Sequence, residues 1–127
     1  MHEFDLYEYA VVRLVPVVER EEFFNVGLLM LCKRKKFLRC EISLCTSKFN
    51  LMKSPLDYTE VEQSLYNLRA IAMGEKQSSP IALLPAEERF RWLTSQRSSV
   101  IQTSRPHPGK SKNLEETFEK LFTELVR

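Results

Sequence analysis

Two apolar stretches joined by a short basic link predict a β-hairpin over residues 25–45. Residues 37–45, FLRCEISLC, alternate apolar and polar side chains, as a strand does when one face is buried and the other meets water. Residues 25–32, NVGLLMLC, are apolar on both faces, which indicates a central strand. The KRKK link is short, so residues 25–45 are predicted to pair as an antiparallel hairpin. Its lysines also discourage edge-to-edge pairing, a role that competes with ligand binding.

Two other segments have the pattern of strands. YEYAVVRLVPV begins at Tyr7, and from Tyr9 to Val15 both of its faces are apolar apart from Arg13. Pro16 ends regular pairing or forces it to a sheet edge. Residues 98–104 are predicted to form a short fourth strand. Gly27 lies inside the second strand and indicates a bulge or a close backbone approach.

Three helices are expected after the hairpin. Asp57 with Glu60 has the spacing of a capping box, and Asn113 with Glu116 repeats it before the last helix. Pro85 suits the first position of a helix between them. Strands followed by helices predict one α+β domain, residues 1–127, with a small antiparallel sheet of three to four strands and about three helices packed mainly on one face.

The composition bears on location and on metal chemistry. The longest apolar run, Val26–Cys32, is far shorter than the roughly 20 residues that span a bilayer. The acidic amino-terminal segment has the wrong charge for a signal peptide, so a cytoplasmic protein without a membrane partner is expected. Three cysteines without a CxxC motif, and two histidines far from them in sequence, do not have the spacing of a zinc site. Cys32, Cys40 and Cys45 are expected to be buried, reduced thiols, and neither a metal nor a cofactor is expected.

One segment is unusually basic and rich in hydrogen-bond donors. The net charge is only +2, but residues 89–112 hold six cations and no acid. Guanidinium groups match carboxylates and phosphates, and Trp92 lies among them. The alternative is that Phe90 and Trp92 belong to the core while the arginines flank it or pair with nearby glutamates. The candidate anion or partner surface consists of Arg20, Asn25, Arg89, Trp92, Arg97, Ser98, Gln102, Thr103, Ser104 and His107.

Two groups of residues on this surface each leave two roles open. Asn25 precedes a buried strand, with Arg20 and Glu22 nearby, and is either part of a polar site or a structural residue at strand entry. Ser104 and His107 are close in sequence, but no acid is near the histidine and no GxSxG motif is present. Catalysis is therefore not expected, although an enzyme acting on an anionic small molecule stays an alternative.

Two motifs in this chain resemble those of a known family. The first consists of Glu19, Arg20, Glu22, Phe23, Asn25, Val26 and Gly27. The second consists of Arg89, Phe90, Trp92, Leu93, Arg97, Ser98, Ile101, Gln102, Thr103, Ser104, His107 and Gly109. With these motifs the chain resembles, over nearly its whole length, the bacterial domain-of-unknown-function family thirty thirty-seven. The family has no established activity, but its members are similar to small proteins encoded beside HipA-like kinases, which implies a cytosolic partner of such a kinase.

The sequence thus predicts an uncharacterised binding or accessory module, with a HipA-like kinase as its candidate partner. Nucleic-acid binding through the same surface and the KRKK link is one alternative, and it requires affinity that falls steeply with salt. Homodimerisation through the last helix or a sheet edge stays open. The deciding observation is whether residues 19–27 and 97–109 are neighbours in space.

Overall fold

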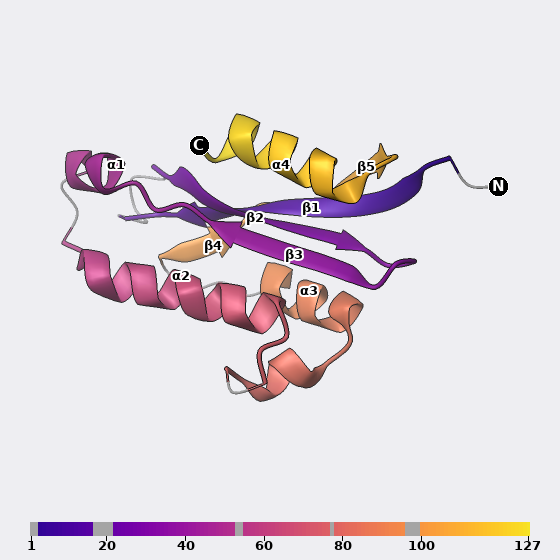
Figure 1. Ribbon diagram of the computed structural model, residues 1–127. Helices are drawn as coiled ribbons and strands as arrows, with labels where there is room; N and C mark the ends of the chain where they lie inside the picture. Colours follow the sequence, from indigo (N-terminus) through magenta and orange to yellow (C-terminus); the bar gives the residue numbers. More distant parts are fainter. Residues whose placement is uncertain (1–2, 17–21, 53–54, 77, 96–99) are drawn as a thin grey trace.

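A five-stranded antiparallel sheet forms the middle layer of the structure (Figure 1). β1 lies in its centre and pairs with β2 on one side, and β2 pairs with β3 at the edge. On its other side β1 pairs with β4 toward one end and with β5 toward the other. The strands are β1 (Asp5–Leu14), β2 (Phe24–Cys32), β3 (Phe37–Ile42), β4 (Ile101–Thr103) and β5 (His107–Ser111).

The computed structural model describes residues 3–16, 22–52, 55–76, 78–95 and 100–127. Helices cover both faces of the sheet: α2 and α3 lie on one side and α4 on the other (Figure 1). The helices are α1 (Thr46–Leu51), α2 (Tyr58–Ala72), the 3-10 helix η2 (Pro80–Leu83), α3 (Ala86–Ser95) and α4 (Leu114–Leu125).

Each face of the sheet has its own apolar core. One core joins Val12, Leu29 and Cys40 of the sheet to the buried residues of α2 and α3. The other joins Val11, Leu28 and Met30 to the apolar stripe of α4. Because β1 and β2 contribute to both cores, their side chains are apolar in nearly continuous runs, as the sequence predicts for a central position.

The α+β class and the antiparallel hairpin are confirmed, and the expected numbers of strands and helices are close to those observed. Both capping predictions hold: Asp57 accepts a hydrogen bond from the Glu60 N–H, and Asn113 accepts one from the Glu116 N–H. Two of the three long helices in the described ranges, α2 and α3, pack on one face, and α4 packs on the other. Cys45 is exposed, so the expectation of three buried thiols is wrong for this residue, which precedes α1.

Gly27 permits a close approach of three strands. The β1–β2 register shifts between Val12 and Arg13, opposite the segment that contains Gly27. A Cβ atom at Gly27 would lie 3.0 Å from the Glu41 carbonyl oxygen and 3.2 Å from the Val12 Cβ. Both features expected of this glycine, an irregular register and close packing, are therefore present.

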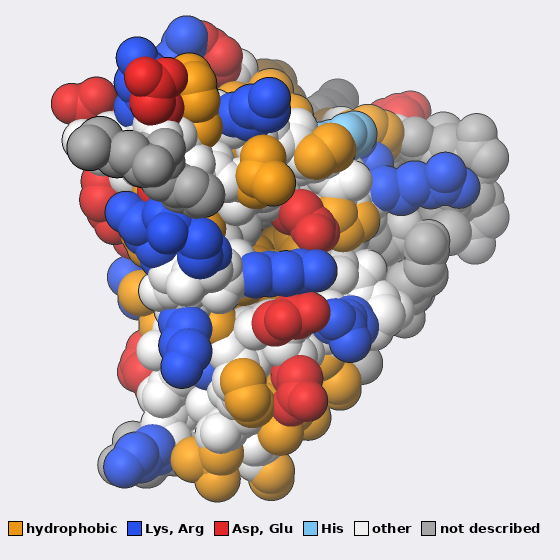
Figure 2. Space-filling model, turned by 90° about the vertical axis from the view of Figure 1, so that its right-hand side faces the viewer, with side chains coloured by type: hydrophobic (Ala, Val, Ile, Leu, Met, Phe, Trp, Pro, Cys, Tyr) orange, Lys and Arg blue, Asp and Glu red, His pale blue; other side chains and the backbone are white. Residues whose placement is uncertain are grey.

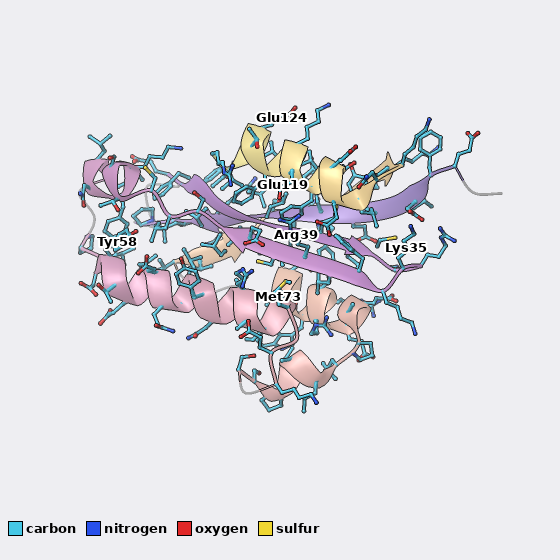
Figure 3. All side chains as sticks on the ribbon, viewed as in Figure 1. Lys35, Arg39, Tyr58, Met73, Glu119 and Glu124 are labelled. Atoms are coloured by element: carbon cyan, nitrogen blue, oxygen red, sulfur yellow. The ribbon has the colours of Figure 1, made fainter. Side chains whose placement is uncertain are left out.

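Ion pairs tie both helical layers to the edge strand β3. Arg39 bonds Glu119 of α4 at 2.6 Å, and both residues are labelled in Figure 3. The Arg39 guanidinium also lies 4.2 Å from the centroid of the Phe118 ring. On the other side, Arg69 of α2 bonds Glu41 at 3.2 Å. Charged residues that point outward from an edge strand discourage the pairing of another strand there.

Candidate functional site

Three polar residues lie side by side across the sheet, where the two sequence motifs meet. Arg13 of β1 pairs with Asn25 of β2 on one side and with Gln102 of β4 on the other. Directly opposed residues of antiparallel strands project from the same face and are about 5 Å apart. We call these three residues the Arg13 row. The described parts of 19–27 and 97–109 therefore flank the same strand.

The Arg13 row faces the C-terminal end of α4. Asn25 Nδ2 donates a hydrogen bond to the Leu125 carbonyl oxygen at 2.8 Å, which fixes the orientation of the amide. The Arg13 guanidinium carbon lies 4.4 Å from the centroid of the Phe23 ring, a cation–π contact. Arg13, Asn25 and Gln102 are each partly buried, and the Phe23 side chain is 49% exposed.

Two atoms of the row are buried without a partner. Arg13 Nε and Asn25 Oδ1 are shielded from solvent, and neither has a hydrogen-bond partner within the part of the chain that the structure describes. Arg13 also forms no ion pair with any acid in that part. A buried donor or acceptor that stays unpaired costs about 1–3 kcal/mol. A donor and an acceptor left unpaired on neighbouring strands are what a polar ligand would satisfy.

Ser104, a predicted site residue, is used within the sheet. Its side chain is buried, and its Oγ accepts a hydrogen bond from the Val11 N–H at 2.9 Å. The same hydroxyl donates to the Arg105 carbonyl oxygen at 3.1 Å, while the Ser104 N–H donates to the Val11 carbonyl oxygen. Ser104 thus bridges the interruption between β4 and β5.

Thr103, Arg89 and Trp92 lie on the face opposite the Arg13 row. Thr103 pairs with Val12, and its Oγ1 donates to the Thr94 carbonyl oxygen. Arg89 donates to the carbonyl oxygens of Ala72 and Leu84, and burial lowers the pKa of its guanidinium. These bonds join the end of α2 to the start of α3, which is a structural role.

Trp92 packs against the core and Phe90 is buried in it, which agrees with the alternative that both aromatic residues belong to the core. Trp92 also lines a groove of about 320 Å³ between α2, α3 and β4. Arg91 pairs with Glu87 one helical turn away. The sheet therefore separates the Trp92 groove from the Arg13 row.

His107 lies on β5 and forms no hydrogen bond with Thr103, Ser104 or Glu22, the partners from the sequence that the structure describes. It is exposed, pairs with Tyr9, and its ring centroid is 5.2 Å from that of Tyr9. Tyr9 is four residues from Arg13, or about 13 Å along the strand. In the described ranges no group of three or more His, Cys, Asp or Glu side chains could hold a metal ion. Arg20, Arg97 and Ser98 lie outside the described residues.

Three of the four cations of the hairpin tip, Lys33, Arg34 and Lys35, are paired with acids. Arg34 and Lys35 bond Asp5 at 2.6 and 3.1 Å, and the Arg34 hydrogen bond lowers the pKa of the Asp5 carboxyl. The Lys33 Nζ atom lies 3.5 Å from the Glu87 Oε1 atom. Figure 2 shows the resulting surface, on which blue and red side chains are interspersed. Among the described residues on this face, the charges do not form the large one-sign patch that is typical of a nucleic-acid interface.

Sequence reasoning names Asn25 and Gln102 but misses Arg13, which joins them. A signal was available: Arg13 is the only charge between Tyr9 and Val15, in a strand that is otherwise apolar on both faces. A charge in such a strand requires a partner or a function.

The fold defines a small α+β domain in which helices cover both faces of an antiparallel sheet, with a polar row at one end. The chain belongs to the family described as Protein of unknown function (DUF3037), whose model matches residues 9–126. Neither a curated protein nor a solved structure matches it. None of the helices in the described ranges combines the length and apolar character needed to cross a bilayer.

Proposed function

We propose that this chain is a non-enzymatic binding or accessory module and that the Arg13 row is its binding surface. The observation that carries the proposal is that two buried atoms on paired residues, Arg13 Nε and Asn25 Oδ1, have no hydrogen-bond partner in the described structure. Gln102 adds an amide on the other side of Arg13. A partner that presents an anionic or mixed polar group would satisfy all three side chains at once.

The surroundings of Arg13 favour recognition over simple solvation. A guanidinium forms two parallel hydrogen bonds with a carboxylate or phosphate, and such bonds strengthen away from water. Arg13 is partly buried, and its guanidinium lies against the face of the Phe23 ring. The row is therefore better suited to one specific anionic group than to diffuse electrostatic attraction.

A HipA-like kinase is the proposed partner, and a bacterial cytoplasm is the proposed setting. Both proposals are supported by the resemblance to the family, because members of that family are similar to proteins encoded beside such kinases. Genomic proximity is an indirect argument. The Arg13 row makes the proposal specific, because it names the residue on which binding should depend.

Calorimetric titration of the kinase with the wild-type chain and two variants tests the proposal. Arg13→Gln removes the charge of the row, and Arg91→Gln removes an exposed arginine on the opposite layer as the matched control. We expect micromolar association that weakens about tenfold or more in Arg13→Gln, with no change in Arg91→Gln. Absence of association at micromolar concentration removes the kinase as partner, and equal effects of both variants remove the row as the surface.

The two alternatives have less support. Nucleic-acid binding would use the hairpin tip, but three of its cations are paired with Asp5, Glu8 or Glu87. Binding to RNA or single-stranded DNA that is absent or insensitive to salt would exclude it. An enzyme would require His107 beside a nucleophile, whereas His107 is exposed and the Ser104 hydroxyl is already used in the sheet.

A further inference from the structure

We infer that the Arg13 row binds the free C-terminal residue of a peptide, with its carboxylate on Arg13 and its backbone N–H on Asn25. This inference rests on the proposed function and names the ligand of the same site. It follows from the chemical character of the two unpaired atoms, which restricts the groups that fit between them.

The orientation of Asn25 decides what the ligand must donate. Because Nδ2 already donates to the Leu125 carbonyl oxygen, Oδ1 can only accept a hydrogen bond, and it needs an N–H or O–H from the ligand. Arg13 Nε, the other unpaired atom, can only donate. The ligand must therefore present an acceptor and a donor close together.

Few common groups meet this requirement beside a positive charge. The ionised carboxylate of an acidic side chain offers acceptors only, leaves the Asn25 oxygen unpaired and repels it. Inorganic phosphate keeps an O–H donor at neutral pH but has no apolar side chain to place on Phe23, so it is included as a probe. A neutral amide supplies both atoms but no charge to match Arg13. The last residue of a peptide has a carboxylate and its own N–H on the same Cα, so it supplies the charge, the acceptor and the donor.

Phe23 bears on which side chain the ligand carries. Its ring lies over the Arg13 guanidinium and is half-exposed, in the segment just before β2 begins at Phe24. The guanidinium donors lie in the plane of that group, so a ring over its face leaves them directed past the ring. The exposed part of the ring offers an apolar surface beside them, so the terminal residue is expected to carry an apolar side chain.

A water molecule that bridges Arg13 Nε and Asn25 Oδ1 is the competing explanation. One water could accept from the guanidinium and donate to the amide oxygen. Such a water would satisfy both atoms without any ligand. The test must therefore separate an occupied structural site from a binding site.

NMR titration with matched probes provides this test. The probes are acetyl-Ala-Leu with a free carboxylate, the same dipeptide with a C-terminal amide, and inorganic phosphate. We expect the free carboxylate to shift the Arg13 Nε–H signal and the amide signals of β2 and β4. Its affinity should be at least about tenfold higher than that of the amide or of phosphate.

Variants then assign the binding to the row. Gln102→Glu places a negative charge beside Arg13 on an edge strand and should reduce dipeptide affinity about tenfold. Arg13→Gln should abolish binding, and Arg91→Gln should leave it unchanged. An unaltered amide spectrum outside the row shows that each variant is folded, and Gln102→Glu serves if Arg13→Gln does not fold.

The outcomes separate this inference from the proposed function. Equal binding of the free carboxylate and the amide overturns the C-terminal assignment while the row stays a binding surface. If no probe shifts the Arg13 signal, a structural water explains the row and the inference is refuted. If the kinase fails to associate but the free carboxylate binds through Arg13, the inference holds and the proposed partner is wrong.

Discussion

Replacing Ser104 by alanine tests whether this predicted site residue holds the sheet together. In Ser104→Ala the Val11 N–H loses its acceptor at a buried position, since the serine hydroxyl rather than a backbone carbonyl receives that bond. A buried N–H left without a partner costs about 1–3 kcal/mol. An unfolding entropy of about 2.1 cal/mol/K per residue amounts to about 0.27 kcal/mol/K for 127 residues, so a loss of about 2 kcal/mol lowers Tm by about 7 °C.

Urea denaturation gives the free energy of unfolding, and native-state hydrogen exchange follows the Val11 amide directly. Ser95→Ala is the control, because the Ser95 hydroxyl bonds the Trp92 carbonyl oxygen in an exposed position at the end of α3. We expect its effect to stay within about 0.5 kcal/mol. If Ser104→Ala costs no more than this control and the Val11 amide keeps its protection, the Val11–Ser104 bond does not stabilise the sheet.

Two other predictions concern Gly27 and the cysteines. Gly27→Ala should destabilise the fold by about 1–3 kcal/mol because the new Cβ meets the Glu41 backbone at 3.0 Å; an unchanged urea midpoint would contradict this. Alkylation should modify Cys45 first, because it is exposed and backbone hydrogen bonds from Lys48 lower the pKa of its thiol, whereas burial raises that of Cys40 to about 12. Peptide mapping after brief treatment at neutral pH checks this order, and equal labelling of both cysteines would refute it.

The parts of the fold that follow from local chemistry could be predicted from the sequence. The hairpin of β2 and β3 follows from strand periodicity, and the starts of α2 and α4 follow from the spacing of Asp57 and Asn113 to the next glutamate. β5 does not follow, because Pro106 and Pro108 weaken any strand pattern. Proline is tolerated there because β5 pairs only with β1 within the described sheet and needs fewer backbone donors than a central strand.

The residues of the site are brought together by the order of strands in the sheet, which the periodicity of the sequence does not predict. Asn25 and Gln102 are predicted from their polar character, but their common neighbour is set by the return of β4 to β1 rather than to β3. The same return places Thr103 on the opposite face from Gln102, since successive residues of a strand alternate. Gln102 and Thr103 are adjacent polar residues in the sequence, but they lie on opposite faces of the sheet because they belong to a strand.

The position of Arg13 in β1 is consistent with the binding role proposed for the row. A valine or leucine would continue the apolar pattern of β1 and would leave no unpaired guanidinium nitrogen beside Asn25. Two unpaired buried atoms, at about 1–3 kcal/mol each, are a large fraction of a typical stability of about 5–15 kcal/mol. Without a water that bridges the two atoms, folding alone does not favour an arginine here, whereas a partner's carboxylate and N–H would offset its cost in the bound state.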